Sequence, residues 1–199
     1  MTRILVAAVL GAIVYYVWGM MAWMALPLHT PTIAGLPNET EVTAILKGQN
    51  LNTGVYTAPM WEREADMGDT ESTFYQNHLA GPVYSIYYQR DGMVPMGPKV
   101  LLMGLVIDFL AALLVAMLLA SAASGCCKSY GYRVGFVVGM GIFTALIGHV
   151  SYWNWMNFPL DYTVAFVIDN VVGWTLAGLV IAAIVTPTVC APKTAEADE

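Results

Sequence analysis

Two apolar stretches decide the fold of this chain: LLMGLVIDFLAALLVAMLLA, residues 101–120, and YTVAFVIDNVVGWTLAGLVIAAIV, residues 162–185. Each is long enough to cross the roughly 30 Å hydrocarbon layer of a membrane as a helix, which takes about 20 residues. Each nevertheless carries one carboxylate, Asp108 in the first and Asp169 in the second. An ionisable group in hydrocarbon is costly unless it is paired or reached by water. The two aspartates are therefore the leading candidates for a functional site.

The composition is that of an integral membrane protein. Of the 199 residues, 58% are hydrophobic and 11% are charged, whereas soluble domains average about 25% charged residues. The apolar residues concentrate in four blocks: Ile4–Leu26, Val100–Ala123, Val134–Val150 and Thr163–Val185. We therefore predict an all-α membrane fold, a bundle of four transmembrane helices.

The four blocks predict the domain organisation. The first is longer than the apolar core of a signal peptide, which runs about 7–15 residues, so we interpret it as an uncleaved signal anchor. The predicted parts are transmembrane helix 1 at 1–26, an extracytoplasmic cap at 27–99, transmembrane helices 2–4 at 100–186, and a cytoplasmic tail at 187–199.

The segment between helices 1 and 2 is predicted to form a small α+β cap. A helix start at Asn38 precedes an apolar side formed by Val42 and Ile45. Residues 54–57 and 83–88 have strand composition, and the acidic residues 62–71 between them indicate an exposed loop. We expect one short helix and two or three strands.

Basic residues predict the orientation, because short cytoplasmic segments are enriched in Lys and Arg. They flank the blocks at both termini and between helices 2 and 3: Arg3, Lys128, Arg133 and Lys193. Both termini should be cytoplasmic in a multi-pass protein of a bacterial inner (plasma) membrane. The cysteines, Cys126, Cys127 and Cys190, then lie on the reducing side, where no structural disulfide is expected.

Helix 3 carries small residues at four-residue spacing: Gly131, Gly135 and Gly139. This spacing lets two helix backbones approach closely. The three glycines are predicted to pack helices together, either within this chain's own bundle or between two chains.

Asp108 and Asp169 are predicted at comparable depth, each on a helix face rich in small residues. Two facing carboxylates in a low dielectric would hold a shared proton or a cation. His149 at the end of helix 3 and Asn170 beside Asp169 are candidate further members of this ion or proton site. The alternative is that these polar groups only fix helix packing by hydrogen bonds.

A metal site is a further alternative, because thioether and imidazole ligands suit Cu(I). Met20, Met24 and His29 cluster near the end of helix 1, and Met20 and Met24 share a helical face. Methionine is also a common filler of apolar cores.

Several functional classes are excluded or unsupported. The net charge of −6 argues against a nucleic-acid partner, because no basic patch could neutralise phosphates. The sequence contains no nucleophile elbow, no phosphate-binding loop and no pair of histidines on one helix. We therefore predict no enzymatic activity, no catalytic residue and no cofactor.

Two runs resemble an uncharacterised family of bacterial four-helix inner-membrane proteins. The first, VWGMMAWMALPLHTPTIAGLPNETEV at 17–42 followed by GVYTAP at 54–59, is similar to the start of that family. The second, NWMNFPLDYTVAFVIDNVVGWTLAGLV at 154–180, is similar to its last helix. The family has no established activity, so the resemblance implies a topology and no catalytic residue.

The leading functional prediction is an accessory or assembly subunit of a larger membrane complex, with the lipid bilayer and other membrane subunits as partners. A glycine-rich helix and a small cap support it. The first alternative is a small proton- or ion-coupled carrier that uses Asp108 and Asp169. The weaker alternative is an extracytoplasmic metal-handling protein.

Overall fold

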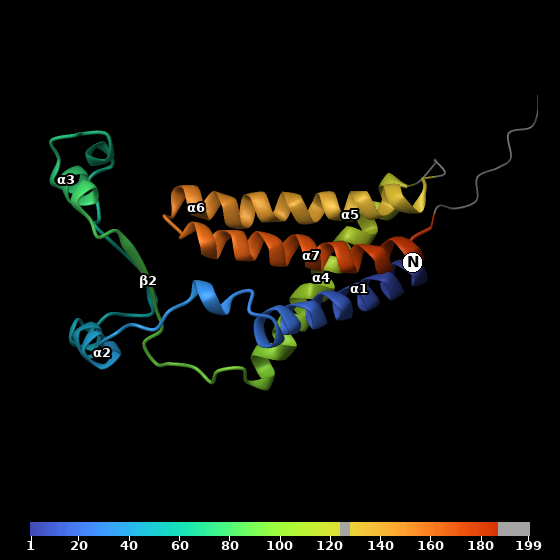
Figure 1. Cartoon of the computed structure of the whole chain (residues 1–199), viewed down its shortest axis with the longest axis horizontal. Helices are drawn as coiled ribbons and strands as arrows, with labels where there is room; N and C mark the ends of the chain where they lie inside the picture. Colours follow the sequence, from blue (N-terminus) through green and yellow to red (C-terminus); the bar gives the residue numbers. More distant parts are fainter. Residues whose placement is uncertain (124–127, 187–199) are drawn as a thin grey trace, which may run out of the picture. The chain divides into compact units, whose positions relative to one another are not determined.

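The structure is a computed structural model that describes residues 1–123 and 128–186. The chain divides into two compact units (Figure 1). The membrane unit combines Met1–Ile33 with the described residues from Met96 onward. The inserted unit comprises Ala34–Pro95.

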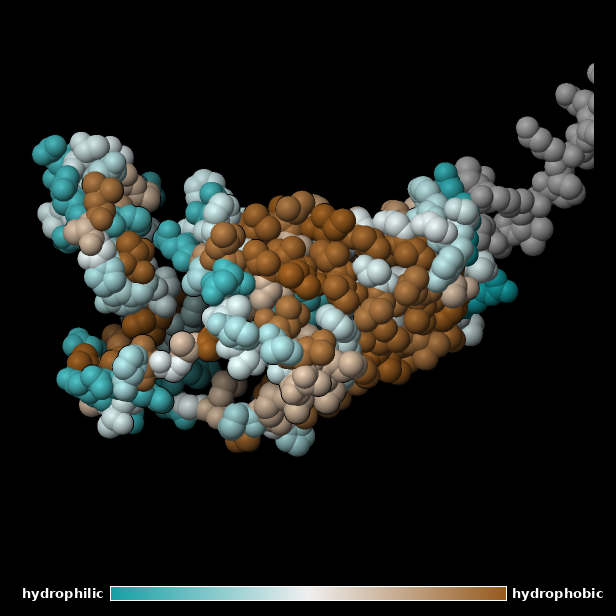
Figure 2. Space-filling model, in the orientation of Figure 1, coloured by the Kyte–Doolittle hydropathy of each residue, from teal (hydrophilic) through white to brown (hydrophobic). Residues whose placement is uncertain are grey.

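Within the described residues, four helical spans are long and apolar enough to cross a membrane. The first is α1 (Thr2–Met20), continued by the π-helical turn η1 (Met21–Ala25), and the second is α4 (Pro98–Ala122). The third joins α5 (Tyr130–Ala145), the π-helical turn η4 (Leu146–Val150) and α6 (Ser151–Trp155), and the fourth is α7 (Leu160–Ile184). Apolar side chains cover the sides of these helices (Figure 2). The predicted four spans are confirmed and indicate a multi-pass membrane protein.

The third span begins earlier than its apolar block suggests. Ser129 caps α5, and its Oγ accepts the backbone N–H of Tyr132 at 3.2 Å. This cap lets the helix start at Tyr130, four residues before Val134. The span then runs through the aromatic end of the block to Trp155.

The helices of the membrane unit pack in the order α4, α1, α7, α5. In Figure 1, α5 lies along α7, and α4 crosses α1 at an angle. Alanines make up half of the buried core between them: Ala7, Ala12, Ala112, Ala116, Ala177 and Ala182. Small residues at helix crossings let backbones approach closely, which favours helix association in lipid.

The glycines that allow the closest approach are not those of the predicted helix-3 series. A Cβ added at Gly141 would lie 2.6 Å from Trp174 Cβ, and one added at Gly173 would lie 2.7 Å from Tyr15 Cε2. By contrast, a Cβ added at Gly131, Gly135 or Gly139 would meet no described atom within 4 Å. These three glycines therefore do not bring helices together within the described chain, and their packing between two chains stays a prediction.

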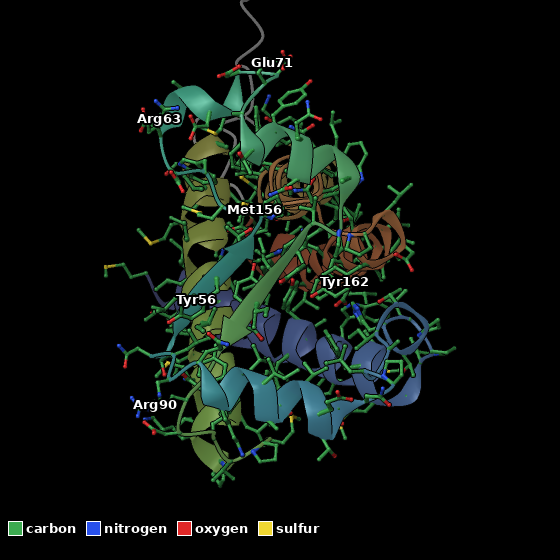
Figure 3. The ribbon with its side chains drawn as sticks, turned by 90° about the vertical axis from the view of Figure 1, so that its left-hand side faces the viewer. Tyr56, Arg63, Glu71, Arg90, Met156 and Tyr162 are labelled. Atoms are coloured by element: carbon green, nitrogen blue, oxygen red, sulfur yellow. The ribbon has the colours of Figure 1, made fainter. Side chains whose placement is uncertain are left out.

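The inserted unit holds two short strands and two helices among its described elements. Helix α2 (Glu39–Gly48) follows Asn38 as predicted. Strands β1 (Gly54–Ala58) and β2 (Tyr84–Tyr88) pair antiparallel, with Tyr56 opposite Ile86. Figure 3 shows this antiparallel pair, with Tyr56 on β1. The predicted α+β composition is confirmed, with two strands.

The segment between the two strands is more ordered than its acidic composition suggests. It contains the 3₁₀ turn η3 (Glu64–Met67) and a second helix, α3 (Thr73–Ala80), where one helix was expected in the whole unit. Ser72 starts α3, because its Oγ accepts the backbone N–H of Tyr75 at 3.1 Å. Asp66 is buried, so the prediction of an exposed loop over 62–71 is wrong at that residue.

Candidate functional site

The carboxylate of Asp169 on α7 is held by two side chains from the first 29 residues. Its Oδ2 lies 2.9 Å from Nε2 of His29. Its Oδ1 accepts a hydrogen bond of 2.6 Å from the indole Nε1–H of Trp18, which also donates to the Asp169 carbonyl at 3.0 Å. Both carboxylate oxygens thus have a donor, as a carboxylate away from water requires.

His29 lies in an aromatic enclosure and is 1% exposed. Its ring stacks on Trp23, with centroids 4.1 Å apart and planes 9° apart, and meets the edge of Phe166 at 4.7 Å. An ionised carboxylate only accepts hydrogen bonds, so a hydrogen on Nε2 points to Asp169. The buried Nδ1 atom has no partner among the described residues. His29 therefore holds Asp169 through one ring nitrogen, while its other ring nitrogen is enclosed without a described partner.

Asn170, the next residue on α7, bonds to α1 and α5. Its Nδ2 donates to the Gly141 carbonyl at 2.7 Å and to Thr144 Oγ1 at 2.9 Å. Its Oδ1 accepts a hydrogen bond of 3.1 Å from the Tyr15 hydroxyl. All the hydrogen-bonding groups of this side chain are used in joining three helices. Asn170 therefore fits the alternative in which the polar groups only fix helix packing by hydrogen bonds.

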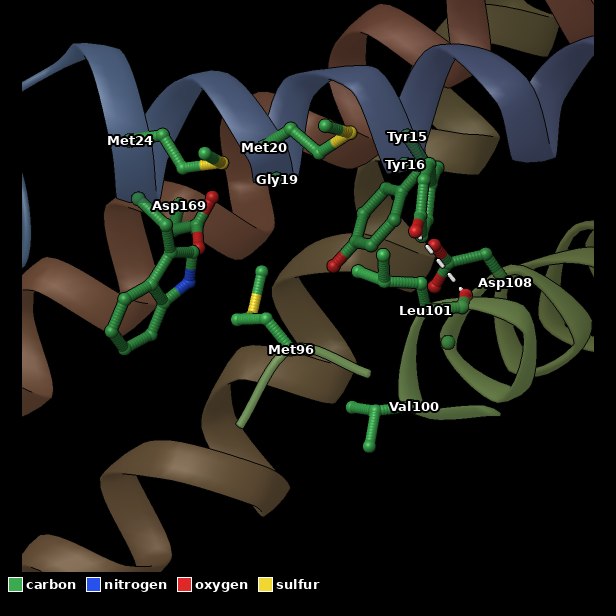
Figure 4. A pocket seen from close by; sticks show the side chains of 12 residues that line it. Tyr15, Tyr16, Gly19, Met20, Met24, Met96, Val100, Leu101, Asp108 and Asp169 are labelled. Atoms are coloured by element: carbon green, nitrogen blue, oxygen red, sulfur yellow. Dashed lines mark hydrogen bonds between the residues drawn. The ribbon is translucent and has the colours of Figure 1, made fainter. Parts of the chain in front are cut away.

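A cavity of about 650 Å³ brings the two aspartates to one place between α1, α4 and α7. We call it the aspartate cavity, and its lining includes Asp108, Asp169, Tyr15, Tyr16, Trp23 and three methionines, Met20, Met24 and Met96. Gly19 and Gly104 line it without side chains. Figure 4 shows Asp169 and Asp108 on two sides of the cavity, with Met20 and Met96 between them in that view.

The two carboxylates differ in how they are held. Asp169 has two donors, whereas Asp108 makes no hydrogen bond with any residue in 1–123 or 128–186. No hydrogen bond joins Asp108 to Asp169 within the same ranges. The site therefore contains one fixed carboxylate and one that is free to meet a ligand.

The other predicted members are placed apart from the cavity lining. His149 on η4 lies with its ring centroid 5.2 Å from that of Phe166, and it makes no hydrogen bond with a described residue. Both His149 and His29 therefore contact the ring of Phe166. Asn170 is committed to helix packing, as described above.

Two of the three predicted metal ligands line the aspartate cavity, and the third does not. Met20 and Met24 line the aspartate cavity and are 43% and 70% exposed. His29 is buried against Trp23 and bonded to Asp169, so its Nε2 is already occupied. No group of three His, Cys, Asp or Glu side chains suited to a metal ion occurs among the described residues. Met96, which we did not predict as a ligand, contributes a third methionine side chain to the cavity.

Trp18 and Tyr15 are site residues that the sequence reasoning missed. Both lie within the first span and carry a polar atom that needs a partner when buried. That requirement was the available signal, since Tyr or Trp in the middle of an apolar span implies an acceptor on a neighbouring helix. Helical spacing alone does not say which acceptor it is.

A second pocket, of about 590 Å³, lies in the inserted unit around Asp66. Asp66 accepts hydrogen bonds from Arg63 at its backbone N–H (3.0 Å), Nε (3.1 Å) and Nη2 (2.8 Å). Burial acts to raise the pKa of the Asp66 carboxyl, but these bonds outweigh burial and hold the pKa below its usual value. Figure 3 labels Arg63 and Glu71 at this part of the unit. The negative charge of Asp66 is thus already paired with Arg63 of the same chain.

The cysteines 126, 127 and 190 and the predicted tail at 187–199 lie outside the described residues. The chain matches no protein-family model, and no curated protein or solved structure is significantly similar to it.

Proposed function

We propose that this protein is a small membrane carrier that exchanges a cation for protons at Asp108 and Asp169. The observation that carries the proposal is that both carboxylates line one cavity within the membrane-spanning helices. Ionisable residues inside membrane spans are rare, face the bundle interior or a water-filled cavity, and mark ion pathways and proton relays. The proposed carrier binds and releases a cation and protons. It forms and breaks no covalent bonds except the bonds to those protons.

The different environments of the two carboxylates support this role. Asp169 is oriented by Trp18 and His29, so its carboxyl group is fixed in position at one side of the cavity. Asp108 has no described partner and is free to take up a cation or a proton.

The test is cation-driven proton movement in liposomes. The purified protein is reconstituted into vesicles that hold a pH-sensitive dye and an acidic interior, and Na⁺ or K⁺ is then added outside. We expect the interior to become alkaline faster than in empty vesicles, and we expect Asp108→Asn and Asp169→Asn to abolish the difference. Asp161→Asn is the matched control, because Asp161 lies at the exposed start of the same helix α7. Equal rates in the parent protein, both variants and empty vesicles would reject the proposal.

A second candidate function is an accessory subunit of a membrane complex. The observation that favours it is the open space around Gly131, Gly135 and Gly139, which leaves this side of α5 free for a helix of another chain. Purification in a mild detergent tests it. Partners that co-purify in fixed ratio with the parent and are lost in Gly135→Leu would support the subunit role, whereas a chain that purifies without them would reject it.

We also propose the predicted orientation, with both termini cytoplasmic in a bacterial inner membrane and the inserted unit outside. Basic side chains gather where α7 ends, which supports it. Arg3 Nη1 donates to Thr186 Oγ1 at 3.0 Å, and Arg133 Nε donates to the Ala182 carbonyl at 3.0 Å. Cysteine labelling in a variant whose native cysteines are replaced by serine tests it. An impermeant maleimide should label Thr70→Cys in sealed cells but label Thr2→Cys only after permeabilisation, and the reverse pattern would overturn the orientation.

A further inference from the structure

We infer that the aspartate cavity binds an amphiphilic organic cation, that is, a quaternary or protonated centre attached to apolar groups. This inference rests on the proposed function, because it names the class of ligand for the same cavity. Three properties of the cavity lead to it: its size, its charge and the character of its walls.

The size suits an organic molecule. The volume of about 650 Å³ lies within the range of roughly 300–1,000 Å³ that is typical of sites for drug-sized ligands. Part of this space exists because Gly19 and Gly104 contribute no side chains to the wall. A Cβ added at Gly19 would meet no described atom within 4 Å, so the space beside it is open.

The charge selects a cation. Asp108 and Asp169 both line the cavity, and no described Lys or Arg does so. Trp18 and His29 already bond to Asp169, while Asp108 has no hydrogen-bond partner within the described chain. A ligand cation near Asp108 would therefore gain a charged contact without displacing a protein group.

The walls favour an apolar cation over a simple metal ion. Tyr16 and Trp23 present aromatic rings, which attract organic cations through their faces. The methionines supply flexible apolar side chains that adapt to ligands of different shape. Hard ions such as Ca²⁺ take six or more oxygen ligands. The hydroxyls of Tyr15 and Tyr16 already donate to Asn170 and to the Leu101 carbonyl (Figure 4), which leaves the two carboxylates as the main oxygen ligands.

Three probes of matched chemistry test the inference by direct binding to the full-length protein in detergent. Tetraphenylphosphonium carries a positive charge and a large apolar surface, tetraphenylborate has the same shape with a negative charge, and tetramethylammonium has the charge with little apolar surface. We expect saturable binding of tetraphenylphosphonium alone, measured by equilibrium dialysis with micelles without protein as the blank. Saturable binding of tetraphenylborate at similar affinity would overturn the charge argument, and preference for tetramethylammonium would overturn the apolar one.

Asp108→Asn is the decisive variant, because it removes the charge without breaking a hydrogen bond with the described chain. We expect it to weaken tetraphenylphosphonium binding by about tenfold or more, because one of the two carboxylates that attract the cation loses its charge. Asp161→Asn, on the exposed end of α7, should bind like the parent. Gly104→Leu should also weaken binding, since its side chain would enter the cavity. Unchanged binding in Asp108→Asn would reject this site.

The outcome separates this inference from the proposed function. If Na⁺ or K⁺ drives aspartate-dependent proton movement while tetraphenylphosphonium does not bind, the carrier proposal stands and the organic-cation class is wrong. If tetraphenylphosphonium binds at Asp108 and no tested cation drives proton movement, the binding site stands and the exchange proposal is wrong.

Discussion

The imidazole of His29 and the carboxylate of Asp169 lie 2.9 Å apart although 140 positions separate them in the chain. His29 follows the first span, and Asp169 lies within the last one. Their contact closes the segment after η1 onto α7 and shields the carboxylate, which is 16% exposed, with the Trp23 and Phe166 rings around His29.

Removing the hydrogen-bonding atoms of His29 should destabilise the membrane unit. His29→Phe keeps a ring against Trp23 but leaves one Asp169 oxygen without its donor. Leaving a buried charged group unsatisfied costs on the order of 2 kcal/mol, which would appear as a lower melting temperature in detergent. His149→Phe is the control, because His149 makes ring contacts and no hydrogen bond with a described residue. Adding Asp169→Asn to His29→Phe should recover part of the loss, and equal melting temperatures of the two single variants would contradict the prediction.

Two glycines should respond to alanine substitution in opposite ways. A Cβ at Gly173 would lie 2.7 Å from Tyr15 Cε2 and 2.9 Å from Trp18 Cδ1, so Gly173→Ala should force these rings to move and cost about 1–3 kcal/mol. Gly135 has open space at the same position. Because alanine favours a helix over glycine, Gly135→Ala should leave the stability of the single chain unchanged or raise it slightly. Thermal unfolding of both variants checks this, and an equal loss in both would show that the described packing is wrong.

Arg133 should stabilise the end of the membrane unit at which α7 ends. It is 8% exposed, and it donates to the Lys128 carbonyl at 2.6 Å and to the Ala182 carbonyl near the end of α7 at 3.0 Å. A cation at a helix C-terminus also interacts favourably with the helix dipole. Arg133→Met should therefore lower the stability by about 1–3 kcal/mol. Arg90→Met, at an exposed arginine of the inserted unit, should have a smaller effect, and a neutral Arg133→Met would contradict the anchoring role.

The region around Asp66 should lose stability in acid. Hydrogen bonds from Arg63 hold the pKa of the folded Asp66 carboxyl below its usual value of about 4, although burial opposes them. The unfolded chain binds the proton at the usual value, so the stabilisation is complete above that pH and is lost as the pH falls through the lower pKa of the folded state.

Hydrogen exchange of residues 62–80 in the full-length protein measures this effect. After correction for the intrinsic pH dependence of exchange, protection should begin to fall near pH 5, about one unit above that usual value, and should go on falling as the pH drops below it towards the lower pKa of the folded carboxyl. Asp66→Asn should reduce protection already at neutral pH and flatten the profile. Asp91→Asn, at an exposed position, should retain the parent profile. The same profile in both variants would assign the acid response to other groups.

The sequence by itself determined the four membrane spans and their approximate bounds. Crossing hydrocarbon requires a long apolar segment whose backbone hydrogen bonds are satisfied locally, so length and composition are enough to predict a helix. The two strands were also predictable from local composition, because their aromatic and β-branched residues are bounded by Gly and Pro. Helix α3 was missed because its start depends on one serine cap within a polar segment that has little apolar periodicity.

Only the tertiary structure decided which groups meet. Helical spacing placed Asp169 on a face with Ala165 and Gly173, but it could not show that His29 and Trp18 from the other end of the chain hold its carboxylate. Likewise, four-residue spacing pointed to Gly135 for close packing, whereas Gly141 lies against Trp174. Periodicity reports which residues share a face of one helix, while the crossing angles and the return of the segment after η1 arise from packing between distant segments. For that reason the spans follow from local composition, and the aspartate cavity follows from the arrangement of α1, α4 and α7.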